Sequence, residues 1–486
     1  MSIARQAARG AAWTLATGVG ARIIGLGGTV VITHFLAPEV MGQVSAAAIL
    51  VMTASLMTSF GFGNYLIVKG GDDPDVAFHM TAYNTFLAGL GFGALYLVAD
   101  WASVVFDVPD AADYVPGLIL ARFIQRFGAL PAKLLVKDLR FGRVGISVAA
   151  GEFTYVVTAV TLAALDFGGH AMVIGNIAQS TAAASITVTG VPWRRWLLPC
   201  RLRWARTVDM LRFGVPLGLG GMVGFATGSW DNLLYARLFG AHQMGLYNLA
   251  YNLAMMPATQ IGDHLGTVLL PSMSKLAPDA RRAALARALS LLALMVFPMS
   301  LGLATVAPSL VASFFDQRWQ GLAPLITCLA AASVFLPVAW AMEAFWTAED
   351  RTRTLLGFQL AKIVLILGGL VALSTLGPVW AATAIGLAMG VHATAGLGDC
   401  VRHGVPLRAL WTGLWRPMAA SVPMIAAVLG ARAGLTALGV DSPRGSLAVE
   451  VTVGAAVYVP AVLVLAPRAS RDLIGLAKQA LRRGDD

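Results

Sequence analysis

The chain has 486 residues, of which 57% are hydrophobic and only 12% are charged. A soluble domain of this size needs more charge to cover its surface, whereas lipid accepts apolar side chains that face outward. The net charge of +10 would suggest nucleic acid as a partner of a soluble protein. The cysteines Cys200, Cys328 and Cys400 are isolated, so neither a disulfide framework nor a zinc site is expected.

Fourteen apolar runs are long enough to cross a bilayer, which takes about 20 residues of helix. The first run begins at Ala11 and has no early small-residue cleavage site, so we interpret it as a membrane span and not as a signal peptide. The sequence therefore predicts an all-α, multi-pass membrane protein. The predicted spans are 11–35, 43–62, 78–98, 114–134, 145–165, 171–191, 213–236, 245–268, 288–310, 321–345, 355–374, 378–397, 412–433 and 447–466.

Basic residues are concentrated on alternate loops between these spans. If the N-terminus is cytoplasmic, the cytoplasmic segments hold 28 of the 35 basic residues. The outside segments then hold only Arg237, Arg318, Arg432 and Arg444. Under the positive-inside rule this distribution places both termini in the cytoplasm, and it explains the net charge without nucleic acid.

A short internal repeat relates the two halves of the chain. Met41-Gly42 and Met244-Gly245 align at an offset of 203 residues, which also superposes the first predicted span on the seventh. Six spans separate the copies, so both halves have the same orientation, and we expect a parallel pseudo-twofold repeat about an axis along the membrane normal. The expected parts are a six-helix bundle at 1–192, a basic cytoplasmic loop at 193–212, a second six-helix bundle at 213–397, helices 13 and 14 at 398–466, and a cytoplasmic amphipathic tail at 467–486.

The run from Leu233 to Leu276 carries a family resemblance. Its characteristic positions are Leu238, Gly245, Tyr247 to Asn252, Pro257 and Val268 to Pro271, and Arg9 to Trp13, Phe314 to Trp319 and Pro324-Leu325 add to them. These residues resemble the Wzx-type polysaccharide flippases, in the colanic-acid and exopolysaccharide exporter branch of the multidrug/oligosaccharidyl-lipid/polysaccharide exporter superfamily. The resemblance implies two six-helix bundles with two extra helices. It also implies alternating-access movement of an undecaprenyl-pyrophosphate-linked oligosaccharide repeat unit across the bacterial cytoplasmic (inner) membrane, for exopolysaccharide or O-antigen biosynthesis with a polymerase and co-polymerase.

Arginines within the predicted spans are candidate substrate-binding residues, because a charge at mid-bilayer costs at least about 2.5–3.5 kcal/mol. Arg22 lies near the middle of the first span, and Arg122 and Arg126 lie at i,i+4 on one face of the fourth. A cavity lined with arginine would stabilise a pyrophosphate through charge-assisted hydrogen bonds. The alternatives are a structural ion pair for Arg22 and a later start of the fourth span, which would place the other two near an interface.

Four polar residues of the eighth span are candidates for sugar contacts: Tyr247, Asn248, Tyr251 and Asn252. Their i,i+4 spacing places hydroxyls, amides and rings on neighbouring faces of one helix, which suits carbohydrate. The alternative is that they make polar contacts between helices.

Three acidic residues are candidates for ion coupling or gating: Asp231, Asp263 (with its neighbour His264) and Glu343. A buried acid favours its protonated form, so each could bind a proton or sodium during a transport cycle. The alternatives are pairing with Arg237 or exposure at the outer interface for Asp231, and salt bridges near the cytoplasm for the others.

No Walker A, GxSxG, HExxH or nucleotide-binding fingerprint is present, so we expect neither an enzyme nor ATP-driven transport from this chain, and no metal or other cofactor. One alternative function is a drug or cation antiporter of the same superfamily, which would favour acids over arginines in its cavity. A second is a flippase for a lipid-linked peptidoglycan precursor. A membrane-embedded sugar polymerase or ligase is disfavoured, because the longest outside loop is only about 15 residues.

Overall fold

The computed structural model describes residues 3–68, 73–440 and 442–482, with side chains except at 3–16, 67–68, 263–268, 270–272 and 476–482. Within these residues the regular structure is helical throughout and contains no strand, so the predicted all-α fold is confirmed. Helices suit a chain this apolar because each satisfies its own backbone groups without water.

Helices of the first half begin and end where the sequence supplies local signals. Pro38 and Pro74 occupy the first turns of their helices, where a missing N–H costs nothing. The Asp73 side chain caps the second of these helices by accepting from the Asp75 amide at 2.9 Å. The elements are α1 (Ile3–Ile32), α2 (Pro38–Met57), α3 (Phe62–Val68), α4 (Pro74–Val105), α5 (Ala111–Lys137), α6 (Phe141–Ala164), α7 (His170–Val188) and the short η1 (Trp193–Arg195).

Helix α8 (Trp204–Ser274) contains two predicted spans and is interrupted between them. At Gly240 the backbone has φ 78° and ψ 173°, a conformation that glycine adopts without the penalty of a side chain. This kink therefore divides α8 into two helices, which carry the seventh and the eighth predicted span.

The second half continues with helices α9 to α16. Two pairs of helices are joined through single 3₁₀ turns, which is common at helix ends. The elements are α9 (Pro278–Phe314), η2 (Gln317–Trp319), α10 (Leu322–Ala332), η3 (Ser333–Phe335), α11 (Leu336–Ala348), α12 (Thr352–Leu373), η4 (Ser374–Leu376), α13 (Pro378–Arg402), α14 (Leu407–Ala437), α15 (Pro443–Leu465) and α16 (Pro467–Arg482).

Each of the fourteen predicted spans falls on helix. Within the described residues, eleven helical segments are long and apolar enough to cross a membrane, with α10 and α11 together forming one of them, Leu322–Ala348. Three predicted spans are not counted separately: α8 is counted once although it contains two predicted spans, α5 carries several charges, and the apolar part of α1 is the shorter Thr17–Ile32. The chain is therefore a multi-pass membrane protein, as predicted.

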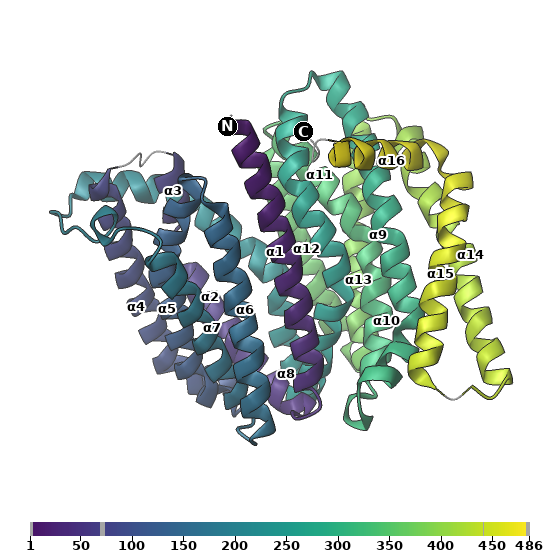
Figure 1. Ribbon diagram of the computed structural model, residues 1–486, viewed down its shortest axis with the longest axis horizontal. Coiled ribbons are helices and arrows are strands. Elements are labelled where there is room, and N and C mark those ends of the chain that lie inside the picture. Colours follow the sequence, from purple (N-terminus) through teal and green to yellow (C-terminus); the bar gives the residue numbers. More distant parts are fainter. Residues whose placement is uncertain (1–2, 69–72, 441, 483–486) are drawn as a thin grey trace. The chain divides into compact units, whose positions relative to one another are not determined.

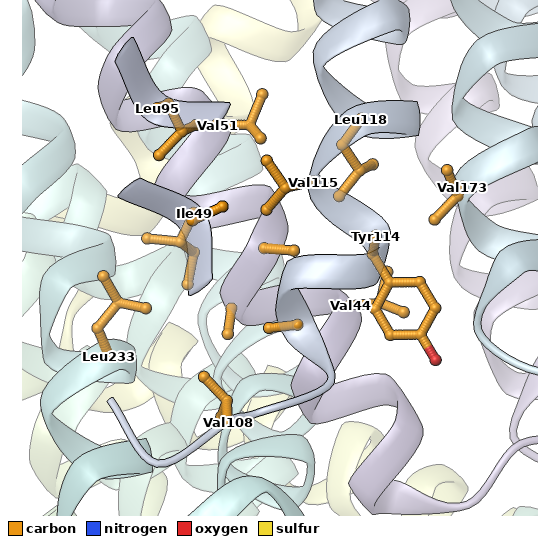
Figure 2. Close-up of a cluster of buried hydrophobic side chains, with 14 of the residues drawn as sticks. Val44, Ile49, Val51, Leu95, Val108, Tyr114, Val115, Leu118, Val173 and Leu233 are labelled. Atoms are coloured by element: carbon orange, nitrogen blue, oxygen red, sulfur yellow. The ribbon is translucent and has the colours of Figure 1, made fainter. Parts of the chain in front are cut away.

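The chain divides into two compact units, residues 1–245 and 246–486. In the first, α7 packs against α5 and α6, and α1 packs against α6 (Figure 1). Figure 2 shows part of its core, where Val44, Val115 and Leu118 meet between α2 and α5. In the second unit, α9 packs against α10, α14 and α15, and α16 runs crosswise to α15 (Figure 1). The domain borders expected from the sequence remain predictions.

Candidate functional site

A cavity of about 600 Å³ with charged residues in its lining lies in the first unit among α5, α6 and α7, and Ser55 of α2 also lines it. Four charged residues line it: Arg122, Arg126 and Lys133 from α5, and Glu152 from α6. A smaller cavity of about 290 Å³ adjoins it and shares Arg126 and Lys133. The lining of both cavities therefore combines apolar and polar side chains, and its charged residues carry an excess of positive charge.

The three basic residues form a stripe along α5. Positions i, i+4 and i+11 of an α-helix fall within about 40° of one another, so Arg122, Arg126 and Lys133 share one face. The stripe is roughly 16 Å long at 1.5 Å per residue. Lys133 is one of the basic residues predicted to lie on the cytoplasmic side, and it was not predicted as a site residue. Its spacing of seven from Arg126 is the signal that identifies it.

The Arg126 guanidinium is bound by two neighbouring helices. Its Nη1 donates to Asn84 Oδ1 of α4 at 2.6 Å, and its Nη2 donates to the Ser55 carbonyl oxygen of α2 and to Thr58 Oγ1 at 3.1 Å. Arg122 is different, because its hydrogen bond to a described residue runs along its own helix, from Nη1 to Gln125 Oε1 at 2.6 Å. Arg126 thus holds helices together, while Arg122 has donors left for a ligand.

Arg22 lies exposed on α1, within electrostatic reach of Glu152. The two helices approach closely, since a Cβ on Gly25 or Gly28 would overlap Glu152 or Val156 of α6. Glu152 Oε2 also accepts a hydrogen bond from Gln179 Nε2 at 2.7 Å. Glu152, for which the sequence predicts no role, therefore lies near Arg22 and also lines the cavity.

The predicted sugar-binding residues begin the second unit. Tyr247 is fully buried, and its ring centroid lies 6.2 Å from that of the half-buried Tyr251. The exposed Asn252 donates from Nδ2 to the Asn248 carbonyl oxygen at 2.8 Å and contacts its Oδ1 at 3.2 Å. Tyr247 and Tyr251 thus lie side by side along one helix, and Asn248 and Asn252 are hydrogen-bonded along the same helix.

The predicted coupling residues lie at separate places. Asp231 is buried in the first unit, where its Oδ1 accepts from Asn232 at 3.1 Å. The side chains of Asp263 and His264 lie outside the described residues. Glu343 of α11 accepts a hydrogen bond from Gln359 of α12. The described residues hold no cluster of three or more His, Cys, Asp or Glu that could bind a metal ion.

Glu343 belongs to a polar group inside the second unit. Lys362 of α12 lies within electrostatic reach of Glu343 and also of His392 on α13. His392 is buried, and its ring meets the Phe358 ring edge to face at 5.7 Å. A carboxylate, an amide, an ammonium and an imidazole therefore share one region of α11, α12 and α13.

The chain is similar to known proteins in its sequence and in its fold. Residues 31–324 match the sequence model of a family described as polysaccharide biosynthesis protein. The lipopolysaccharide biosynthesis protein WzxC of Escherichia coli (strain K12) is 25% identical over 450 residues, 87% of each chain. The succinoglycan biosynthesis transport protein ExoT of Rhizobium meliloti is 22% identical over 335 residues, 66% of this chain and 67% of ExoT. The inward closed structure of the lipid II flippase MurJ has a TM-score of 0.72 at 12% identity, covering 95% of this chain and 99% of MurJ, which shows a shared fold.

Proposed function

Because the chain belongs to the polysaccharide biosynthesis protein family, among the Wzx-type flippases of the multidrug/oligosaccharidyl-lipid/polysaccharide exporter superfamily, we propose that it flips an undecaprenyl-pyrophosphate-linked oligosaccharide repeat unit. The proposed membrane is the bacterial cytoplasmic membrane, with both termini in the cytoplasm. The cargo would be used by a polymerase and co-polymerase to make exopolysaccharide or O-antigen. The proposed mechanism is alternating access.

The basic stripe of α5 is the observation that supports this cargo most directly. A pyrophosphate carries several negative charges, and guanidinium groups offset its desolvation through charge-assisted, often bidentate, hydrogen bonds. Arg122 has donors available for such bonds, and Lys133 adds charge to both of the adjoining cavities. Glu152 is the one acid among the residues lining these cavities, which disfavours a cationic drug as cargo.

We assign the remaining predicted residues to sugar contact and ion coupling. Rings and amides bind carbohydrate hydroxyls and apolar sugar faces, so we assign sugar contact to Asn248, Tyr251 and Asn252, while the buried Tyr247 supports the Tyr251 ring. Of the acids Asp231, Asp263 and Glu343, we assign coupling to Glu343. Its Lys362 neighbour disfavours sodium, so the proposed coupling ion is a proton.

The test is export of polymer by a cell that depends on this chain. We expect Arg122→Gln to reduce surface polymer by roughly tenfold or more at equal protein level, because a hydrogen bond between a guanidinium and an anion stabilises binding by about 1.5–3 kcal/mol. Arg194→Gln is the matched control, since Arg194 is an exposed arginine of η1 in the same unit. Undiminished polymer in the Arg122 variant would overturn the anion-binding role.

A purified system separates the proposed cargo from its alternatives. Vesicles containing the full chain would be supplied with a fluorescent undecaprenyl-pyrophosphate oligosaccharide, with lipid II, or with a cationic dye. We expect the oligosaccharide lipid alone to reach the opposite leaflet faster than in empty vesicles. Faster movement of lipid II would favour the peptidoglycan precursor, and dye accumulation would favour the drug antiporter.

A further inference from the structure

The second unit contains a strongly basic pocket that includes none of the candidate site residues. It measures about 900 Å³ and lies between α9, α14 and the first turns of α16. Two of its arginines come from α14, two from α16 and one from α9. These residues are Arg408, Arg416, Arg468, Arg471 and Arg287, and Asp472 is the one acid among the lining residues.

The single carboxylate does not neutralise this charge. Asp472 Oδ2 accepts from Arg287 Nε at 2.8 Å, so that pair is already formed. Arg408, Arg416 and Arg468 make no ion pair with any residue that the structure describes. Three guanidinium groups that converge on one pocket without a carboxylate partner favour an anion with several oxygens.

An apolar surface adjoins the pocket along α14. Trp411 and Trp415 are 64% and 39% exposed, and they flank Thr412 and Arg416 of the pocket lining. Tryptophan is enriched where a membrane span meets the headgroup layer. The exposed apolar residues of this face, at helical spacing, are Leu407, Trp411, Trp415, Met418 and Val422.

The orientation of helix α16 indicates how deep in the membrane the pocket lies. This helix begins directly after α15 and runs crosswise to it (Figure 1), as an amphipathic helix lying in the plane of a membrane surface does. Arg468 and Arg471 of its first turns line the pocket, while Leu473 packs against the core formed by α9, α14 and α15. With the proposed cytoplasmic C-terminus, the pocket lies at the headgroups of the cytoplasmic leaflet.

We propose that this pocket binds the phosphate headgroup of an anionic phospholipid of the cytoplasmic leaflet, with its acyl chains along the apolar face of α14. Basic pockets between spans on the cytoplasmic side are suited to such headgroups. Three arginines without carboxylate partners suit a headgroup with two phosphates, as in cardiolipin, better than one with a single phosphate. This inference rests on the proposed orientation and is independent of the proposed cargo.

Native mass spectrometry of the purified full chain tests the proposal. The chain would be titrated in detergent with cardiolipin, phosphatidylglycerol and phosphatidylcholine. We expect affinity to fall in that order, and Arg408→Gln/Arg416→Gln to weaken cardiolipin binding by roughly tenfold or more. The matched control is Arg353→Gln/Arg402→Gln, which removes two exposed arginines of the same unit outside the pocket and should bind as the unaltered chain does.

Two further ligands test whether the pocket binds a phospholipid or another phosphate compound. Inorganic pyrophosphate should not displace cardiolipin, because it lacks chains for the apolar face. Farnesyl diphosphate stands for the isoprenyl diphosphate of the cargo, and tighter binding of it than of cardiolipin would overturn the phospholipid assignment. Equal cardiolipin binding by all variants, or equal binding of phosphatidylcholine, would also overturn it. If the glutamine variant unfolds, Arg408→Lys/Arg416→Lys takes its place, with weakened cardiolipin binding expected because lysine lacks the planar fork.

Discussion

Gly42 of α2 and Gly245 of α8 pack against each other backbone to backbone, in a reciprocal contact within the first unit. A Cβ on Gly42 would overlap the carbonyl oxygen of Ala241, and a Cβ on Gly245 would overlap the carbonyl oxygen of Pro38. Residues 38 and 241, like 42 and 245, are separated by the repeat offset of 203. Equivalent groups therefore exchange equivalent contacts, which is the pattern of a local twofold axis.

Replacing either repeat glycine with alanine should destabilise the protein. We expect Gly42→Ala or Gly245→Ala to lower the free energy of unfolding by about 1–3 kcal/mol, because overpacking forces backbone shifts. Gly89→Ala is the control, since a Cβ there meets nothing within 4 Å and alanine favours helix. Thermal unfolding in detergent measures the difference. Equal melting temperatures for all three variants would show that the backbone packing yields without penalty.

Sequence periodicity and charge predicted the positions of the helices well, but they did not predict which contacts single residues make. Apolar run length and the basic loops defined the fourteen spans, because burial in lipid constrains every residue of a span. The role of Arg126 could not be predicted, since its partners Ser55 and Asn84 are 71 and 42 residues away in sequence. Nothing in the sequence distinguishes a guanidinium used by neighbouring helices from one, such as Arg122, with donors to spare.

The different surroundings of these two arginines predict different effects of substitution. Arg126→Met should lower the free energy of unfolding by about 1–3 kcal/mol, because the Ser55 carbonyl and Asn84 lose a donor in a partly buried site. Arg122→Gln should change it by only about 0.5 kcal/mol. Denaturation of the purified variants in detergent measures both values. A stable Arg126 variant that fails only in export would instead assign Arg126 to the cargo.

The surroundings of Glu343 predict coupling to protons. Sodium prefers a shell of oxygen ligands, whereas Glu343 accepts a hydrogen bond from the Gln359 amide nitrogen and lies within electrostatic reach of the Lys362 ammonium. We expect a proton gradient to raise the rate of flipping in vesicles by roughly tenfold, which is a usual size for coupling between two binding sites. Glu343→Gln should abolish this response. Glu39→Gln, at an exposed position of α2 in the other unit, is the control and should keep the response. Acceleration by a sodium gradient that Glu343→Gln loses would contradict the proton assignment.

Arg432 of α14 and Glu450 of α15 predict how the last two spans are held to the second unit. Arg432 donates from Nε and Nη2 to the two carboxylate oxygens at 2.8 Å each, and Glu450 also accepts from Ser309 Oγ of α9 at 2.7 Å. Glu450 is fully buried, so removal of Arg432 leaves a buried charge without its counter-ion. We expect Arg432→Leu or Glu450→Leu alone to lower the free energy of unfolding by about 3–5 kcal/mol.

The double variant Arg432→Leu/Glu450→Leu should be more stable than either single variant, because it buries no unpaired charge. The control is Asp316→Asn, which breaks the exposed pair with Arg318 and should lower the free energy of unfolding by no more than about 1 kcal/mol. Thermal unfolding of the unaltered chain, the two single variants and the double variant in one detergent completes a double-mutant cycle, with Asp316→Asn measured beside it. Additive losses in the double variant would show that the two side chains act independently, and the attachment of α14 and α15 would then depend on apolar packing alone.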